Sequence, residues 1–371
     1  MLIGVPKEIK NHEYRVGLTP ESVAELIDAG QKVIVETGAG AGIGASDTAY
    51  RKAGAKIVKT AEKVFEKADM IVKVKEPQPV ECALLRPGQI LYTYLHLAPD
   101  PKQTKALIKS GAICIAYETV TSDKGELPLL KPMSQVAGRL AIQAGAVALQ
   151  KEAGGRGVLL GGVPGVTPGK VVVVGGGVVG FNAAQMAVGL QADVSILDRD
   201  PDVMENLSNH FGASAKVIRS TPAVLAELIK TADMVVGAVL IPGAAAPKLV
   251  TKAMLKTMQP GAVLVDVAID QGGCFETSHA TTHAEPTYIV DGIVHYCVAN
   301  MPGAVARTST YALNAVTLRH AKDIAIKGWK QALTDNPHLK NGLNVAEGKI
   351  TYAAVGEALG LKYIDADEVL N

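Results

Sequence analysis

The sequence contains few cysteines and no apolar leader. Its four cysteines are scattered along 371 residues and form no CxxC pair. This spacing is typical of reduced thiols in a cytosolic protein and does not fit a disulfide framework. The first ten residues, MLIGVPKEIK, become charged at position 7 and include no apolar signal core. We therefore expect a cytoplasmic protein.

The sequence also lacks an excess of either charge. Its 37 basic and 36 acidic residues give a net charge of +1, and no Lys/Arg cluster is present. With 48% hydrophobic and 20% charged residues, it predicts a globular protein whose partners are neither nucleic acid nor membrane. One uncharged stretch, residues 171–192, is long enough for a membrane span. Because it contains GGGVVG and Asn182, we interpret it as strand, turn and helix.

Strand-like and helix-like segments alternate in two series. The first runs from LIGVPKE (2–8) to AICIAYETV (112–120), and the second from VVVV (171–174) to YCVANMP (296–302). Such alternation predicts parallel sheets covered by helices on both faces. We therefore predict an α/β fold with two doubly wound, Rossmann-like domains, one inserted into the other. The predicted limits are 1–130 for the first part of the outer domain, 131–304 for the inserted domain, and 305–371 for helices that return to the outer domain.

A long helix is predicted between the two series. The string SQVAGRLAIQAGAVALQKEAGG (134–155) spreads its apolar residues among alanines, which favours one largely buried helix. The next string, GRGVLLGGVPGVTPG (155–169), is rich in glycine and proline, and we predict a loop there.

A glycine loop follows the four valines of the second series. Residues 175–180, GGGVVG, fit G-x-G-x-x-G between a buried strand and a helix. Gly175 permits the tight turn, Gly177 lets the backbone approach a pyrophosphate, and Gly180 lets helix and strand pack closely. Asp198 ends the next strand, where a carboxylate accepts from a ribose 2′-hydroxyl and favours NAD over NADP. Arg199 beside it points the other way, since an arginine there accommodates a 2′-phosphate.

Long strings of unusual composition extend over nearly the whole chain. They are GVPKEIKNHEYRVGLTP (4–20), VKVKEPQP (72–79), LHLAPD (95–100), PLLKPMSQVAGR (128–139), GVLLGGVPGV (157–166), GGGVVG (175–180), VDVAIDQGGCFE (265–276) and VANMPGAVARTSTYAL (298–313). With these strings the chain resembles the alanine dehydrogenase family, which is related to the nucleotide-binding part of proton-translocating nicotinamide nucleotide transhydrogenase. In one departure, Gly176 stands where the family often has alanine, and we expect no chemical cost.

The resemblance implies a role for particular residues. Arg15 would hold the substrate carboxylate, Lys75 would contact the keto acid, and His96 would be the catalytic acid/base. Asp270 would be a second catalytic group near the nicotinamide. Met133 would lie against the site. The remaining positions that match cofactor contacts are Ser134, Val178, Val179, Asp198, Ser220, Val239, Leu240, Val267, Ala268, Ile269, Asp270, Val298, Ala299, Asn300 and Met301.

Three of these residues lie at the ends of strand-like strings, where open α/β sheets bind ligands. They are Lys75 in MIVKVKEP (70–77), His96 in ILYTYLHL (90–97) and Asp270 in AVLVDVAID (262–270). The residues alone leave plainer interpretations open. Arg15 fits an exposed loop arginine, Lys75 a solvated lysine beside Lys73, His96 a core histidine, and Asp270 a cap of the following turn.

A metal site is the alternative for the histidines near residue 280. His279 and His283 are four positions apart, and Cys274, His295 and Cys297 lie nearby in sequence. The string SHATTHAEPT is typical of a loop and not of a helix that would present both imidazoles on one face. Neither CxxC nor HExxH accompanies it. We therefore predict no metal.

The function that the resemblance implies is the NAD-dependent, reversible oxidative deamination of L-alanine to pyruvate and ammonia. The resemblance also implies a homo-oligomer, a hexamer. One alternative is the hydride-transfer subunit of a transhydrogenase; His96 and Lys75 argue against it, because such a subunit has no amino acid to deprotonate. Another alternative is a non-catalytic protein that keeps the fold and senses NAD. Production of NADH from alanine and NAD⁺ discriminates between these hypotheses.

Overall fold

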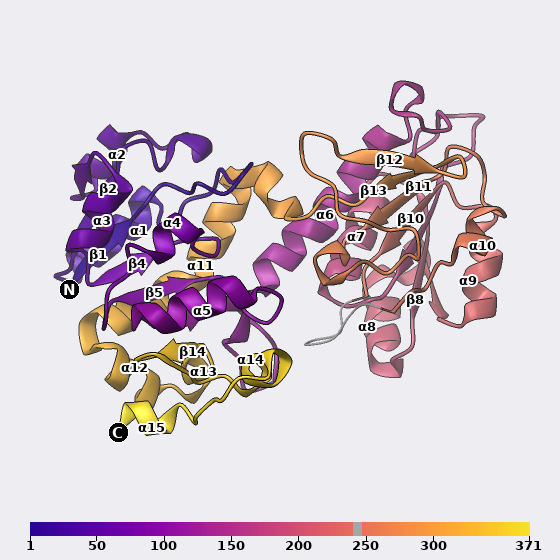
Figure 1. Ribbon diagram of the computed structural model, residues 1–371. Helices are drawn as coiled ribbons and strands as arrows, with labels where there is room; N and C mark the ends of the chain where they lie inside the picture. Colours follow the sequence, from indigo (N-terminus) through magenta and orange to yellow (C-terminus); the bar gives the residue numbers. More distant parts are fainter. Residues whose placement is uncertain (240–246) are drawn as a thin grey trace. The chain divides into compact units, whose positions relative to one another are not determined.

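The computed structural model describes residues 1–239 and 247–371, which form two compact units. Unit 1 comprises residues 1–133 and 303–371, and unit 2 comprises residues 134–302 (Figure 1). Both units are sheets of mainly parallel strands covered by helices, with unit 2 inserted in sequence into unit 1. The predicted fold class is therefore confirmed. In the described part of the chain, no helix combines the length and apolar character that a membrane span requires.

Unit 1 contains an eight-stranded sheet in the order β15-β14-β6-β5-β4-β1-β2-β3. Strands β1 to β6 are parallel to one another, whereas β14 is antiparallel to both β6 and β15. The central strands are apolar and buried on both faces, as a doubly covered parallel sheet requires. The strands are β1 Leu2–Val5, β2 Lys32–Glu36, β3 Lys56–Val58, β4 Met70–Val72, β5 Ile90–Thr93, β6 Ile113–Ala116, β14 Leu343–Ala346 and β15 Lys349–Ile350.

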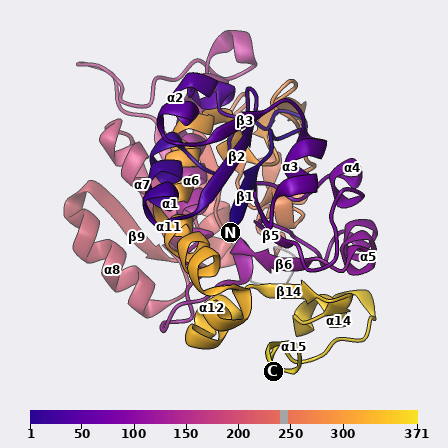
Figure 2. The same cartoon turned by 90° about the vertical axis from the view of Figure 1, so that its left-hand side faces the viewer.

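Helices cover both faces of this sheet. Figure 2 shows α1 and α11 on one side and α3, α4 and α5 on the other, and side chains of these last three form one core cluster with the strands. The helices of unit 1 are α1 Pro20–Asp28, α2 Asp47–Lys52, α3 Ala61–Lys67, α4 Pro79–Cys82, α5 Pro101–Ser110, α11 Ala306–Lys327, α12 Trp329–Asp335, α13 Pro337–Lys340, α14 Ala353–Leu359 and α15 Asp367–Leu370.

Unit 2 contains a seven-stranded sheet in the order β12-β13-β11-β10-β7-β8-β9 (Figure 1). All its strands are parallel except β12, which forms an antiparallel hairpin with β13. The strands are β7 Lys170–Val174, β8 Asp193–Asp198, β9 Ala215–Arg219, β10 Met234–Gly237, β11 Val263–Asp266, β12 Thr287–Val290 and β13 Ile293–Tyr296, and the helices are α7 Val178–Gly189, α8 Pro201–Phe211, α9 Pro222–Ile229 and α10 Lys252–Leu255.

Several predicted boundaries are wrong. The helix predicted over 134–155 is α6, Lys131–Ala148, followed by a 3₁₀ turn, η3, Lys151–Ala153. The chain turns back there because Gly154 has a φ of 87° and a Cβ at Gly155 would lie 2.3 Å from the carbonyl oxygen of Ala148. The strand expected at 296–302 is likewise misplaced, since β13 ends at Tyr296.

Candidate active site

The three polar side chains predicted for substrate follow neighbouring strands of unit 1. Arg15 lies in the loop after β1, Lys75 three residues after β4, and His96 three residues after β5. Because β5, β4 and β1 are adjacent and parallel, these loops leave the same edge of the sheet. The strands predicted to reach Lys75 and His96 end earlier, but the Thr93 hydroxyl donates to the carbonyl of Lys75 and keeps the two loops together (2.9 Å).

Arg15 is buried and paired with Glu13. Its Nε donates to Oε1 of Glu13 at 2.7 Å and its Nη2 to Oε2 at 2.6 Å, while Nη1 donates to the sulfur of Met133 at 3.2 Å. Burial by itself lowers the pKa of Arg15, but the bond and charge of Glu13 outweigh burial and raise the pKa above its ordinary value. With 2% of the side chain exposed, Arg15 is not the exposed loop arginine that the sequence left open. Met133 thus contacts Arg15, the residue predicted to hold the substrate carboxylate.

A buried ion triad stands beneath the loop of Lys75. Lys73 donates to Oε2 of Glu8 at 3.0 Å and to Oε1 of Glu81 at 2.6 Å. The second oxygen of Glu8 accepts the backbone N–H groups of Val74 at 2.7 Å and Lys75 at 3.3 Å. Glu8 therefore fixes the backbone from which the Lys75 side chain projects.

The charges of this triad depend on one another. Burial raises the pKa of Glu8, although Lys73 opposes the shift. Burial by itself lowers the pKa of Lys73, but Glu8 and Glu81 outweigh burial and raise it. The triad thus retains a protonated lysine in an interior where an unpaired ammonium would lose its proton. Sequence reasoning missed all three residues, since a lysine two positions from Lys75 suggested a solvated strand.

Lys75 is itself largely buried. Its side chain is 12% exposed, and its Nζ lies 3.5 Å from Oε2 of Glu76, which also pairs with Lys10. Burial by itself raises the pKa of Glu76, but Lys75 and Lys10 outweigh burial and lower it. The solvated interpretation of Lys75 is therefore wrong. Its ammonium group is largely buried and is paired with one carboxylate, that of Glu76.

His96 is more open than the predicted core histidine. Its side chain is 43% exposed, and its φ of 50° lies in the left-handed region that few residues other than glycine adopt. The imidazole stacks on Tyr94 with 5.9 Å between ring centroids. Glu118, in the 3₁₀ turn η2 (Tyr117–Thr119) after β6, accepts the backbone N–H of His96 at 2.6 Å. An exposed imidazole on a fixed backbone suits proton transfer.

The glycine loop of unit 2 adopts the conformation that its pattern predicts. Gly175 has a φ of 98°, and a Cβ at Gly180 would lie 1.7 Å from the carbonyl oxygen of Gly175. Open space surrounds the Cβ position of Gly177, and α7 begins at Val178 without a side-chain cap. The loop thus needs glycine for the turn at Gly175 and for the packing at Gly180.

Other predicted cofactor contacts converge on this loop. Asp198 ends β8, and one carboxylate oxygen accepts the N–H of Gly176. Ser220 donates its N–H to the Asp198 carbonyl at 2.7 Å, and a side-chain methyl of Val239 lies 3.0 Å from the Cβ position of Gly175. Leu240, also predicted to contact the cofactor, lies outside the described residues. The sheet edge therefore assembles residues from four separate loops.

The segment that carries Asp270 is held by a buried acid that sequence reasoning missed. Asp266 ends β11, and its carboxylate accepts the N–H groups of Ala268 at 3.1 Å and Cys274 at 2.9 Å and the hydroxyl of Ser278. Asp270 is exposed in the 3₁₀ turn η5 (Ile269–Gln271), so the expectation that it ends a strand is wrong. The predicted contacts 298–301 follow β13, which pairs with β11.

The histidines weighed as metal ligands have other partners. His295 bonds to the Thr277 hydroxyl at 2.8 Å and to a backbone carbonyl, and the ring of His279 stacks on Tyr288. His283 contacts the carbonyl of Asn300 at 3.2 Å. Over residues 1–239 and 247–371, no three His, Cys, Asp or Glu side chains are grouped as a metal ion requires.

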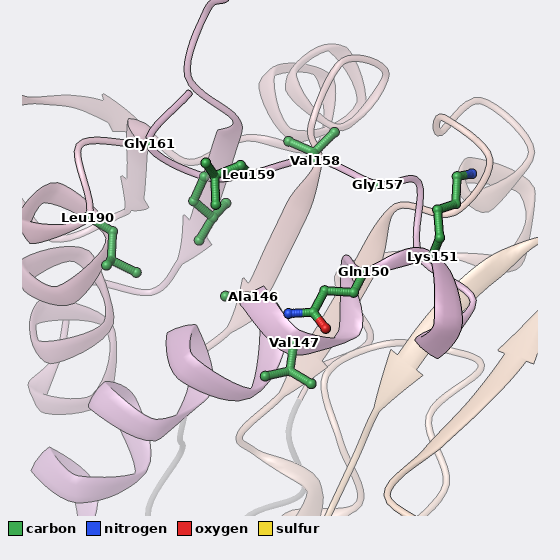
Figure 3. Close-up of a pocket in the computed structure, with 10 residues that line it drawn as sticks. Ala146, Val147, Gln150, Lys151, Gly157, Val158, Leu159, Gly161 and Leu190 are labelled. Carbon is green, nitrogen blue, oxygen red and sulfur yellow. The ribbon is translucent and has the colours of Figure 1, made fainter. Parts of the chain in front are cut away.

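A cavity in unit 2 lies apart from the predicted contacts. It has a volume of about 580 Å³ and is formed by the end of α6, the following loop and the end of α7 (Figure 3). None of the predicted site residues lines it. Its lining residues are Ala146, Val147, Gln150, Lys151, Gly157, Val158, Leu159, Leu160, Gly161 and Leu190.

Two Rossmann-like units, one with a nucleotide-type glycine loop and one with clustered arginine, lysine and histidine, define a two-domain oxidoreductase. Comparison with known proteins places it more closely. Residues 4–137 match the family described as alanine dehydrogenase/PNT, N-terminal domain, and residues 141–353 match the corresponding C-terminal domain. The chain therefore belongs to the alanine dehydrogenase/PNT family, as the resemblance predicted.

Individual relatives match this chain over all or nearly all of both sequences. The chain is 58% identical to alanine dehydrogenase of Halomonas elongata over all of both chains, and 55% identical to that of Bacillus subtilis over all of this chain and 98% of the relative. A solved L-alanine dehydrogenase matches 97% of this chain and 99% of its own, with 50% identity and a TM-score of 0.94. A transhydrogenase from Sinorhizobium meliloti is similar at 27% identity, with a TM-score of 0.82 and coverage of 95% and 100%. The chain is thus more similar to these dehydrogenases than to that transhydrogenase.

Proposed function

We propose that this amino-acid dehydrogenase catalyses the reversible, NAD-dependent oxidative deamination of L-alanine to pyruvate and ammonia. The observation that carries the proposal is the convergence of Arg15, Lys75 and His96 on adjacent loops of one sheet edge. Relatives named alanine dehydrogenase that are 51–58% identical over the full chain support the choice of substrate. We assign catalysis to residues 1–130 and 305–371 and cofactor binding to residues 131–304.

Each side chain has a task that its chemistry suits. We propose that Arg15 binds the substrate carboxylate through the guanidinium end that now donates to the Met133 sulfur, a weak acceptor that a carboxylate would replace. Lys75 stabilises the negative charge that develops on the carbonyl oxygen. The chemistry that bound NAD⁺ would supply is acceptance of a hydride from Cα of the neutral amine. His96 takes a proton from the water that adds to the resulting iminium and returns it to the nitrogen as ammonia leaves. It then takes the hydroxyl proton as the carbonyl forms and passes that proton to solvent. Asp270 offsets positive charge beside the nicotinamide.

The cofactor assignment follows the position of Asp198. Its carboxylate accepts the N–H of Gly176 in the glycine loop, where it would accept from ribose hydroxyls and would repel a 2′-phosphate. We propose that the cofactor also contacts residues near the glycine loop. They are Ser134, Val178, Val179, Ser220 and Val239. A transhydrogenase subunit would share this loop, but it would not need Lys75 and His96.

One assay tests the proposal. The purified chain is mixed with L-alanine and NAD⁺ at alkaline pH, and NADH is followed by its absorbance. We expect NADH to form with L-alanine and NAD⁺ and much more slowly with NADP⁺. Hydride exchange between two nucleotides without alanine would favour the transhydrogenase alternative, and NAD binding without turnover would favour a sensor.

We also propose that the chain assembles into a cytoplasmic homohexamer. Unit 2 exposes the apolar side chains of Val147, Leu159 and Leu190 around its cavity, and Leu159 is 68% exposed; Val163 and Val166 are also exposed, in the loop that follows. Exposed apolar residues gathered in this way are typical of a protein interface. Light scattering should give the mass of six chains, and Leu159→Lys should reduce it. A monomer at micromolar concentration would contradict this proposal without touching the catalytic one.

A further inference from the structure

Glu118 joins the loop after β6 to the loop that carries His96. One of its oxygens accepts the N–H of His96 at 2.6 Å, and both oxygens lie within 3.2 Å of the N–H of Leu95. The Glu118 side chain is 13% exposed, so water competes weakly for these bonds. His96 keeps its left-handed φ of 50° at this point. The carboxylate therefore compensates for a backbone conformation that a residue other than glycine rarely adopts.

The same carboxylate faces the imidazole. Nδ1 of His96 lies 3.9 Å from Oε1 of Glu118, which is too long for a hydrogen bond and within the range of an ion pair. The ring of Tyr94 stacks on the imidazole at an interplanar angle of 9°. Nδ1 thus faces an anion, and Nε2 is the other ring nitrogen available for chemistry.

Glu118 is the carboxylate that lies beside the imidazole of His96, and the neighbouring groups of Tyr94 and Leu95 are neutral. Tyr94 donates its hydroxyl to the carbonyl of Leu129 at 2.6 Å, and burial raises the pKa of Tyr94 well above its ordinary value, although Arg15 opposes the shift. Tyr94 therefore stays neutral. Leu95 presents backbone only, and its carbonyl accepts from the side chain of Gln103. Among the described residues, the carboxylate paired with the imidazole is that of Glu118, which lies in the turn after β6 and not in the loop of His96.

We propose that Glu118 is a positioning residue for His96, an inference that rests on the proposed function. Its charge draws the Nδ1–H toward itself, so that Nε2 exchanges protons with the substrate. When Nε2 takes a proton, the Glu118 carboxylate supplies the counter-charge of the imidazolium. The proton then passes back to the substrate or to water. Acid–imidazole pairs in which a carboxylate orients the ring use the same physics.

Glu118→Gln separates the charge from the backbone bonds. The amide oxygen of glutamine still accepts the N–H groups of Leu95 and His96, whereas the negative charge is lost. Because the imidazolium loses its counter-charge, the pH limb of alanine oxidation should move down by about one unit or less, a modest shift since His96 is partly solvated. The maximal rate should also fall about tenfold, because the ring loses the charge that orients it. The affinity for NADH should not change.

A second readout does not need turnover. Diethyl pyrocarbonate acylates neutral imidazole, so the pH dependence of His96 modification, followed by mass spectrometry of its peptide, reports the same titration. Its midpoint should be lower in Glu118→Gln than in the unaltered chain. The matched control is Glu126→Gln, which removes an exposed carboxylate of the same connection and should leave both midpoints in place.

The outcomes are distinct. Equal midpoints in Glu118→Gln and the unaltered chain, with or without lower activity, would overturn the proposal, because Glu118 would then act only on the backbone. A shifted modification midpoint in a protein that does not oxidise alanine would support the charge pairing and refute the proposed function. Glu118→Ala, which loses the backbone bonds as well, should lower the rate and the melting temperature further than Glu118→Gln.

Discussion

The two units fix their predicted functional groups by different physical means. In unit 1, buried carboxylates hold the parts of the site: Glu13 binds Arg15, Glu8 binds the backbone of Lys75, and Glu118 binds that of His96. In unit 2, the glycine loop is shaped by the absence of side chains, since a Cβ at Gly175 or Gly180 would overlap backbone atoms. Unit 1 should therefore be sensitive to loss of charge, and unit 2 to added volume.

Neither the buried carboxylates of unit 1 nor the glycines of unit 2 serve stability alone. A buried ion pair pays for desolvation with its Coulomb energy and is on balance weak evidence of stabilisation. Its benefit here is geometric, because each acid fixes a loop that has no regular secondary structure. The glycines of unit 2 lose more backbone entropy on folding than other residues would, and they permit a turn that other residues do not fit.

Gly180→Ala should have the largest effect. The new Cβ would lie 1.7 Å from the carbonyl oxygen of Gly175, and no side-chain rotation relieves a clash with backbone. We expect a loss of more than about 4 kcal/mol in the free energy of unfolding of unit 2 and no measurable NADH binding. Gly189→Ala is the control, because the end of the same helix has open space and the added methyl favours the helix. Urea unfolding and NADH fluorescence would show both effects, and NADH binding retained by Gly180→Ala would break the comparison.

Lys73→Met should have the next largest effect, now in unit 1. It leaves the carboxylates of Glu8 and Glu81 buried without their shared cation, at a cost of about 3–5 kcal/mol in the free energy of unfolding. Lys63→Met, which breaks an exposed pair on α3, should leave the free energy of unfolding nearly unchanged. Adding Glu8→Gln and Glu81→Gln to Lys73→Met should recover part of the loss. Equal stability of the Lys73 and Lys63 variants would show that charge does not organise unit 1.

The contrast between the units also explains what sequence reasoning could predict. The glycine loop and Asp198 are close in sequence and follow a pattern whose spacing encodes shape, so their arrangement could be predicted from the residues. Helix α6 and the strand before Asp270 were predicted too long, because apolar composition does not mark where Gly154 turns the chain or where Asp266 captures the next loop.

The charge network of unit 1 could not be predicted in this way. Lys73 and Glu8 are 65 positions apart, and a lysine in a strand suggests solvent unless its partner is known. Arg15, Lys75 and His96 were found only through the resemblance, and the acids that hold them were missed. A glutamate close in sequence to a predicted site residue is a local signal for such pairs, as with Glu13 near Arg15 and Glu76 next to Lys75.

Acid should weaken unit 1 through His320 on α11. This imidazole is buried and its Nδ1 has no hydrogen-bond partner in the described structure; burial, with help from Arg319, lowers its pKa to about 4. Below the unfolded value of about 6.5 the unfolded chain binds a proton that the folded chain refuses, so stability falls as the pH drops from about 6.5 toward about 4. The loss at pH 5 should be about 2 kcal/mol. His320→Gln should remove it from urea unfolding curves measured at pH 7 and pH 5.

His295 in unit 2 provides the comparison for that measurement. Burial lowers its pKa too, but both ring nitrogens have hydrogen-bond partners. His295→Gln should therefore change the acid slope less than His320→Gln. The reverse order would mean that unit 2 is the acid-sensitive part of the chain.

Arg15→Lys keeps the positive charge of unit 1 and removes the planar fork. A lysine cannot make both bonds to Glu13 and also present two donors to a carboxylate. The KM values for alanine and pyruvate should rise about tenfold, the value of one charge-assisted hydrogen bond, while the affinity for NADH stays the same. Arg51→Lys, on the exposed side of α2, is the control. An unchanged KM for pyruvate would place Arg15 outside the substrate site.

Gly176→Ala should have the smallest effect, although it adds the same methyl group as Gly180→Ala only four positions away. The new Cβ would lie 2.5 Å from Cδ1 of Leu207 and 3.0 Å from a methyl of Val203, so the clash is with side-chain ends that can shift. Because these side chains must move to make room for the methyl group, we expect a cost of about 1 kcal/mol in stability.

Binding of NADH should change less than about fivefold in Gly176→Ala, because the N–H that Asp198 accepts is still present. Leu207→Val opens space at the contact and by itself costs stability through a small cavity. If the volume argument is right, the double variant Gly176→Ala/Leu207→Val is more stable than the sum of the two single losses predicts, since one change fills what the other empties. Strict additivity would mean that the methyl at position 176 strains the backbone instead, and the distinction between a tolerant and an intolerant glycine in this loop would fail.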